Sequence, residues 1–186
     1  MRLSSELFFV SSNTHKFEEV KRILSKTGLD INFFKLTLEE IQSDSLGEIA
    51  KHKAIDAFSR VQKPLIIEDD GLFIDSLNGF PGPYSSYVYD TIGNKGLLRL
   101  LENSESRNAK FVAIIAYSNG IDDVKLFESS ISGKISLSIE DGGWGYDPIF
   151  IPDGETKTYA NVSDKDNLSH RAVSLKKFSS WFLHKQ

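Results

Sequence analysis

The chain of 186 residues contains no cysteine, and it has no long hydrophobic run and no excess of positive charge. Without cysteine it can form no disulfide, no thiol nucleophile and no thiolate-ligated zinc site, which fits a reducing compartment. A formal charge of −4 indicates no broad basic surface for duplex DNA or an anionic membrane. The longest strongly apolar stretch, from Phe111 to Tyr117, has the length of a buried strand, and Leu7–Val10 is too short for a signal peptide. We therefore expect a cytoplasmic protein without nucleic-acid or membrane partners.

Apolar runs alternate with segments of helical periodicity in the first half of the chain. Later, two long apolar segments flank Asn119-Gly120, a pattern typical of a hairpin. This order predicts an α/β fold with a mixed sheet, in a single domain over residues 1–186. We expect strands at 7–10, 31–36, 65–67, 72–74 (resumed past Gly71 through a bulge), 110–118 and 124–135, and helices at 17–24, 49–58, 96–102 and from about Ser169.

A polar segment opens the first predicted helix. Helix amino termini present unsatisfied N–H groups and a partial positive charge, so a phosphate there would interact with both the amides and the Lys16 ammonium. The alternative is a capped surface helix whose Lys16 points into water. The last helix repeats the pattern, because His170 and Arg171 fall in its first turn, although a capping role is an alternative for His170. The segment comprises Ser11, Ser12, Asn13, Thr14, His15 and Lys16.

Acidic residues gather at the end of a third predicted strand. Glu68, Asp69 and Asp70 repel one another unless they are solvated, protonated or bound to a cation. In an extended chain Glu68 and Asp70 point to one side and Asp69 to the other. Magnesium usually takes one or two carboxylates, and Asp44 could supply a further oxygen. A solvated acidic turn is the alternative reading. Lys53 falls among apolar helix positions and could reach inward to phosphate or extend its stem to solvent.

Aromatic residues gather in a third polar segment, where Trp144 and Tyr146 flank Gly145. If this segment is extended, both rings face the same side, which suits stacking on a purine. The alternative is that the two rings fill the core. Asp147 follows directly and adds a carboxylate acceptor and a backbone donor.

These segments, in this order, resemble the inosine triphosphate pyrophosphatase family, which hydrolyses deaminated purine nucleoside triphosphates such as ITP, dITP and XTP. The resemblance extends nearly from end to end. It is carried by Ser11-x-Asn13-x-x-Lys16, Glu68-Asp69-Asp70-Gly71-Leu72, Gly79-Phe80-Pro81-Gly82-Pro83-Tyr84-Ser85, Trp144-Gly145-Tyr146-Asp147-Pro148, and Lys165 with Ser169-His170-Arg171.

The resemblance implies an elongated, two-lobed α/β fold with the substrate in a cleft between lobes, usually as a homodimer. It implies attack at the α-phosphorus, which yields a nucleoside monophosphate and pyrophosphate. Asp69 would be the catalytic carboxylate, acting with magnesium (or manganese) on the attacking water, and Asp44 and Glu68 would be further metal-side acids. Lys16 and Lys53 would meet the triphosphate. The base would be surrounded by Trp144, Gly145, Tyr146, Asp147, Lys165, His170 and Arg171.

Three positions depart from the family pattern. Asp70 stands where the family often has Ser or Thr, and it adds a negative charge near the phosphates. Ser12 replaces a common glycine, and Trp144 replaces a phenylalanine and enlarges the stacking surface. None of the three removes a group that the chemistry requires.

A donor such as Arg171 and the mixed donors and acceptors near Asp147 favour a keto base over adenine, whose hydrogen-bonding edge is reversed. Two other functions remain open at this point. One is a Maf-like nucleotide pyrophosphatase acting on pyrimidine or modified nucleotides, and the other is a nucleotide-binding module without catalytic activity.

Overall fold

The computed structural model describes residues 6–185, which form two compact units. Unit 1 comprises the described residues up to Asp69, Ala113–Ser129 and those from Arg171 onward, and unit 2 comprises Asp70–Val112 and Ser130–His170. Three strands contribute residues to both units. They are β3 (Leu65–Ile74), β5 (Asn108–Ser118) and β6 (Val124–Ile135).

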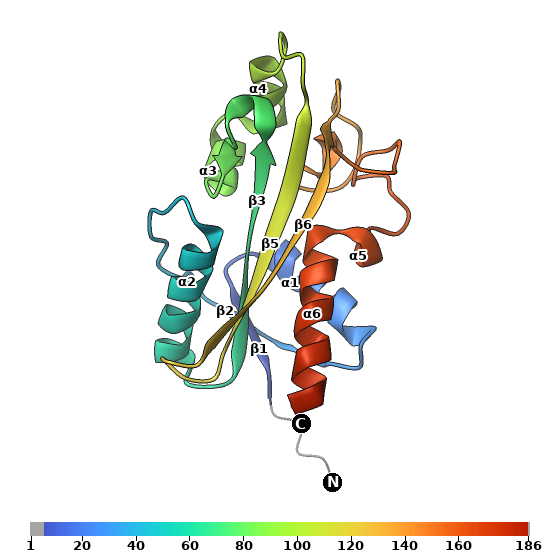
Figure 1. Ribbon diagram of the computed structural model, residues 1–186. Helices are drawn as coiled ribbons and strands as arrows, with labels where there is room; N and C mark the ends of the chain where they lie inside the picture. Colours follow the sequence, from blue (N-terminus) through green and yellow to red (C-terminus); the bar gives the residue numbers. More distant parts are fainter. Residues whose placement is uncertain (1–5, 186) are drawn as a thin grey trace. The chain divides into compact units, whose positions relative to one another are not determined.

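A seven-stranded mixed sheet underlies the fold, with the strand order β2-β1-β3-β5-β6-β7 and with β4 paired to β3 (Figure 1). Strand β1 is parallel to both β2 and β3, whereas β4 and β7 run antiparallel to their neighbours. The α/β class and the mixed sheet predicted from the sequence are therefore confirmed. The short strands are β1 (Phe8–Ser11), β2 (Asn32–Lys35), β4 (Pro81–Gly82) and β7 (Phe150–Pro152).

In unit 1, helices cover both faces of the sheet (Figure 1). They are α1 (Thr14–Ser25), α2 (Leu46–Val61) and α6 (His170–Lys185). Helices α1 and α6 share one core with the strands, in which Val20, Leu24 and Phe178 are fully buried. Helix α2 lies against the other face, where its Gly47 approaches Ile114 and Leu126. Each such large apolar side chain contributes about 1.5–3 kcal/mol on burial.

Unit 2 is built around a second core, which includes Leu72, Leu97 and Phe150. Arg107 joins its elements, because its guanidinium donates to the carbonyl oxygens of Leu101, Ile135 and Ser136. The helices of this unit are α3 (Ser85–Thr91), α4 (Gly93–Leu100) and α5 (Lys165–Leu168), with 3₁₀ turns at Asp75–Leu77 and Asp147–Ile149.

Strand β3 runs through Gly71, so the predicted continuation of the strand past this residue is confirmed. A glycine is required here because a Cβ at Gly71 would lie 2.5 Å from the carbonyl oxygen of Gly82 on the paired strand β4. The sequence patterns also missed α3 and α5, which are too short to show helical periodicity. None of the helices in residues 6–185 has the length and apolar character that a bilayer crossing requires.

Candidate active site

The start of helix α1 is organised by its own polar side chains. Asn13 is the N-cap, and its Oδ1 accepts from the backbone N–H of Lys16 at 3.1 Å. Ser11 Oγ in turn accepts from the backbone N–H of Asn13. Ser12, Thr14 and His15 are exposed. The predicted capped helix is thus present, and its first turn contains no acidic residue that would offset the helix dipole.

The Lys16 ammonium points back toward a buried ion network in unit 1. Its Nζ lies 2.8 Å from Glu68 Oε2. Arg171 Nε donates to the other oxygen of Glu68 at 3.0 Å, and Arg171 Nη1 donates to Glu19 at 2.9 Å. Arg171, Glu19 and Glu68 are all almost fully buried. Buried charges of this kind are tolerated only when they are paired, so the network fixes all its members.

The Nε and Nη1 of Arg171 are directed at two carboxylates of unit 1. The expected place of Arg171 beside the base stays a prediction. Pattern alone could not reveal this pairing, because its acids are distant in sequence. Glu19, which the sequence analysis missed, carries one signal: it is an acid beside Val20 on the buried face of α1.

Asp69 is the most strongly perturbed acid of the site. Burial raises its pKa to about 6, against the opposing influence of the nearby Lys53 and Lys16 ammonium groups. Lys53 Nζ lies 2.6 Å from Asp69 Oδ1. Of the two predicted orientations of this lysine, inward or toward solvent, the structure therefore shows the inward one. Asp69 Oδ2 is buried and has no hydrogen-bond partner among residues 6–185. A carboxylate with a pKa near neutrality and one unused oxygen is suited to act as a general base.

The predicted carboxylate trio of Asp44, Glu68 and Asp69 is not assembled. Across the described part of the chain, no three acidic or histidine side chains are placed together to hold a metal ion. Asp44 is exposed, in the loop just before α2. Glu68 and the unused oxygen of Asp69 still fit magnesium, because this ion commonly takes only one or two carboxylates. Glu40, which the sequence analysis missed, lies near this group, 3.3 Å from Lys53 Nζ.

In unit 2, Asp147 and Lys165 form the centre of the predicted base-binding residues. Lys165 Nζ donates to Asp147 Oδ2 at 2.7 Å, and both side chains are largely buried. The backbone N–H of Trp144 donates to the same oxygen at 3.3 Å. The lysine also lies 6.0 Å from the centre of the Trp144 ring, a cation–π distance. These contacts join three of the predicted residues in one group.

The predicted extended segment through Trp144 and Tyr146 is wrong. Gly145 has a φ of +58°, a left-handed conformation that glycine adopts without strain, so the chain turns between the two rings. Tyr146 is buried in the core of unit 2, and its hydroxyl donates to the Ser85 carbonyl at 2.9 Å. Burial raises the pKa of this phenol far above its usual value. Trp144 is only partly buried, and it alone of the two rings offers an accessible face.

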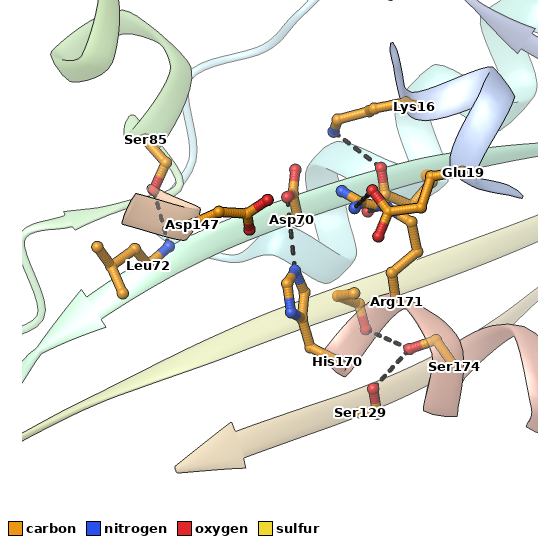
Figure 2. Close-up of polar contacts among 12 residues, drawn as sticks. Lys16, Glu19, Asp70, Leu72, Ser85, Ser129, Asp147, His170, Arg171 and Ser174 are labelled. Atoms are coloured by element: carbon orange, nitrogen blue, oxygen red, sulfur yellow. Dashed lines mark hydrogen bonds and ion pairs between the residues drawn. The ribbon is translucent and has the colours of Figure 1, made fainter. Parts of the chain in front are cut away.

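His170 is buried in unit 2 and stacks in parallel on Phe111, with ring centroids 4.4 Å apart. Its Nε2 lies 3.7 Å from Asp70 Oδ2 (Figure 2). The predicted alternation along β3 is confirmed, since Asp69 meets Lys53 while Glu68 and Asp70 each meet a residue at the start of α6.

The mixed sheet, together with a buried carboxylate that lies beside two lysines in the middle of strand β3, defines an α/β enzyme with a site for an anionic substrate. Residues 7–181 match the Ham1 family, and the chain belongs to this family. A dITP/XTP pyrophosphatase of Methanopyrus kandleri is 43% identical over 180 residues, covering 95% of this chain and 96% of that protein. One from Korarchaeum cryptofilum is 44% identical over 178 residues, covering 95% and 96%.

The fold has a counterpart among solved structures. The Ham1 protein of Staphylococcus aureus superposes with a TM-score of 0.79 at 28% sequence identity, covering 96% of this chain and all of that one (100%).

Proposed function

We propose that this protein hydrolyses deaminated purine nucleoside triphosphates (ITP, dITP and XTP) to the nucleoside monophosphate and pyrophosphate, removing them from the nucleotide pool. It is a hydrolase acting on phosphoric anhydrides. The observation that carries the proposal is Asp69, a buried carboxylate with a pKa of about 6, held by Lys53 and left with one unused oxygen. The relatives that match over almost the whole chain carry the name of this activity.

In this mechanism Asp69 orients the attacking water and accepts its proton, because its pKa places it close to neutral pH. Lys16 and Lys53 stabilise the negative charge that develops on the departing pyrophosphate. Glu68 and Asp69 would hold a magnesium ion, with manganese as the alternative, and the bound ion would neutralise phosphate charge and make the water more acidic. Arg171 holds Glu68 in place through the hydrogen bond that its Nε donates to the Glu68 carboxylate.

The base is taken by residues of unit 2. Trp144 offers its ring face for stacking, and Lys165 donates to the carbonyl oxygen that hypoxanthine and xanthine carry at position 6. Asp147 can accept from the N–H at position 1 of these bases. Adenine presents an amine and a lone pair at the same two positions, so its hydrogen bonds would be unmatched. A site of this kind discriminates by about 10⁴-fold or more.

A cytoplasmic location and a homodimer complete the proposal. The absence of cysteine fits a reducing compartment. The dimer follows from the family resemblance, and sedimentation equilibrium of the purified protein would test it directly.

Pyrophosphate release from ITP, XTP, dITP, ATP and GTP in the presence of magnesium tests the activity. We expect turnover of the three deaminated substrates, far slower turnover of ATP, and loss of all turnover with a chelator. GTP shares the keto edge of ITP, so its slow turnover requires that its 2-amine finds no partner in the site, at a cost of about 1–3 kcal/mol. Faster release from dTTP or UTP than from ITP would instead identify a Maf-like enzyme. Binding without turnover would identify a nucleotide-binding module.

A further inference from the structure

One acidic side chain outside the predicted site, Glu140, holds the loop that carries Trp144 and Asp147 in place through hydrogen bonds. Glu140 Oε2 accepts from Thr158 Oγ1 at 2.8 Å and from Asn161 Nδ2 at 2.8 Å. The backbone N–H of Thr158 approaches the same oxygen at 3.4 Å. Asn161 Nδ2 also donates to the carbonyl of the next residue, Asp141, at 3.3 Å. One carboxylate oxygen thus holds two segments of unit 2 together.

Further hydrogen bonds link the region around Glu140 to the predicted base-binding residues. The backbone N–H of Ala160 donates to the Asp147 carbonyl at 3.2 Å, and that of Glu140 donates to the Pro148 carbonyl at 3.0 Å. Gly143 lies so close to Ala160 that a Cβ would be 3.1 Å from the Ala160 Cα. Residues 140–143 and Asp147 therefore contact the segment 158–161, which precedes Lys165 in α5 by a few residues.

The loop needs these hydrogen bonds because its own backbone is free to adopt many conformations. Gly142, Gly143 and Gly145 all have positive φ, and glycine loses more conformational freedom on ordering than any other residue. No helix or strand includes residues 136–146. The hydrogen bonds from Asn161 and Thr158 are strong enough to lower the pKa of Glu140, so the side chain is a charged acceptor at neutral pH.

We propose that Glu140 is a positioning residue for base recognition, which fixes the loop so that Trp144 and the Asp147–Lys165 pair meet the base in a defined geometry. This inference rests on the proposed function. Glu140 acts only through the loop, whereas Lys16, Lys53 and Asp69, which we assign to the phosphates and the chemical step, belong to unit 1. Its effect should therefore appear in nucleotide binding and not in the chemical step.

The test is a comparison of Glu140→Ala with Glu155→Ala, an exposed glutamate on the same chain segment. We expect Glu140→Ala to raise KM for ITP about tenfold, because ordering the loop must then occur on binding, with kcat changed by less than about threefold. Inhibition by inorganic pyrophosphate, which lacks a base, should be unchanged. Glu140→Gln keeps the acceptor oxygen and should restore most of the affinity, and Glu155→Ala should match the unmodified protein.

Thr158→Val offers an independent variant should Glu140→Ala fold poorly, because it removes one donor and keeps the side-chain shape. It should raise KM for ITP in the same direction. An equal weakening of pyrophosphate inhibition, or a fall in kcat without a change in KM, would overturn the proposal.

Hydrogen exchange at the Ala160 and Thr158 amides separates this inference from the proposed function. Glu140→Ala should accelerate both, whether or not the substrate class is correct. If no deaminated nucleotide is hydrolysed yet exchange accelerates, the proposed function fails while the fastening role stands. Unchanged exchange would refute the role of Glu140 itself.

Discussion

The two units position their functional groups in different ways. In unit 1 the groups lie on strands and helices and are fixed by buried charge pairs, as in the contacts of Glu68 with Lys16 and Arg171. In unit 2 they lie largely on a loop, where Asp147 is held by Lys165 and by a backbone amide. Regular elements position side chains more precisely than loops do.

This difference matches the demands of the two halves of the reaction. A reacting water must be aligned with the phosphorus within a few tenths of an ångström, and misplacement is costly in rate. A base needs only to be accepted or rejected by its edge, which a fastened loop can do. We therefore expect substitutions in unit 1 to affect turnover or folding strongly, and substitutions in unit 2 to affect mainly affinity and specificity.

The largest effect is expected for Asp69→Asn. An amide cannot accept the proton of the attacking water, so kcat for ITP should fall by about 10²–10⁴-fold. Asp30→Asn, an exposed acid of the same unit, is the matched control and should leave kcat unchanged. If the Asp69→Asn protein has nearly normal activity, another group is the base. The expected contrast, with effects on turnover in unit 1 and on affinity in unit 2, would then be contradicted.

Arg171→Ala should lower the free energy of unfolding by about 3–5 kcal/mol, because Glu19 and part of Glu68 are left as uncompensated buried charges. Urea unfolding followed by circular dichroism measures this. The control is Arg60→Ala, which breaks an ion pair on the surface with Asp56 and should cost less than about 1 kcal/mol. Similar losses for both variants would mean that the buried network contributes no more than a surface pair.

The pH dependence of stability tests Asp69 without any substrate. Its folded-state pKa is raised from 3.8 to about 6, so the folded protein binds this proton more tightly than the unfolded chain. The associated stability is present below about pH 4 and is lost as the pH rises through about 6. In metal-free solution, the unfolding free energy of Asp69→Asn relative to the unmodified protein should therefore rise by about 2 kcal/mol between pH 4 and pH 7. Parallel curves for the two proteins would contradict the raised pKa.

The smallest effect is expected in unit 2. Tyr146→Phe removes the hydrogen bond to the Ser85 carbonyl and should lower the unfolding free energy by about 1 kcal/mol. Its KM for ITP should change little, because the Tyr146 ring belongs to the core and not to a stacking surface. Tyr87→Phe, at a position 71% exposed, should change neither quantity. A large rise in KM for Tyr146→Phe would show that this ring does contribute to the base-binding surface.

The sequence predicted the fold class and most long elements, because hydrophobic periodicity over ten or more residues reflects burial directly. Strand β6 was predicted with the bounds that the structure has, and β3 alternates its three acids as expected. The short helices α3 and α5 were missed, since seven and four residues carry too little periodicity. The continuation of β3 past Gly71 was predicted correctly, and the glycine permits the close approach of the backbone of strand β4.

Candidate site residues could be identified from the sequence where a local pattern marks them. They could not be paired where the interacting residue is distant in the chain. Lys16 and Asp69 were singled out from a predicted helix start and a predicted strand end, although β3 continues past Asp69 to Ile74. The link from Arg171 to Glu19 was not, because nothing in a sequence marks residues that pair across 152 positions. The turn at Gly145 was missed because a loop conformation depends on contacts such as those of Glu140 and Asn94, which no local pattern encodes.

The remoteness of Arg171 also has a kinetic consequence. It lies 103 residues after Glu68 and 152 residues after Glu19. During synthesis both acids emerge from the ribosome before the cation that pairs with them, and at about 5–20 residues per second the delay lasts about 5–30 s. The buried ion network of unit 1 can therefore form only after α6 has been synthesised.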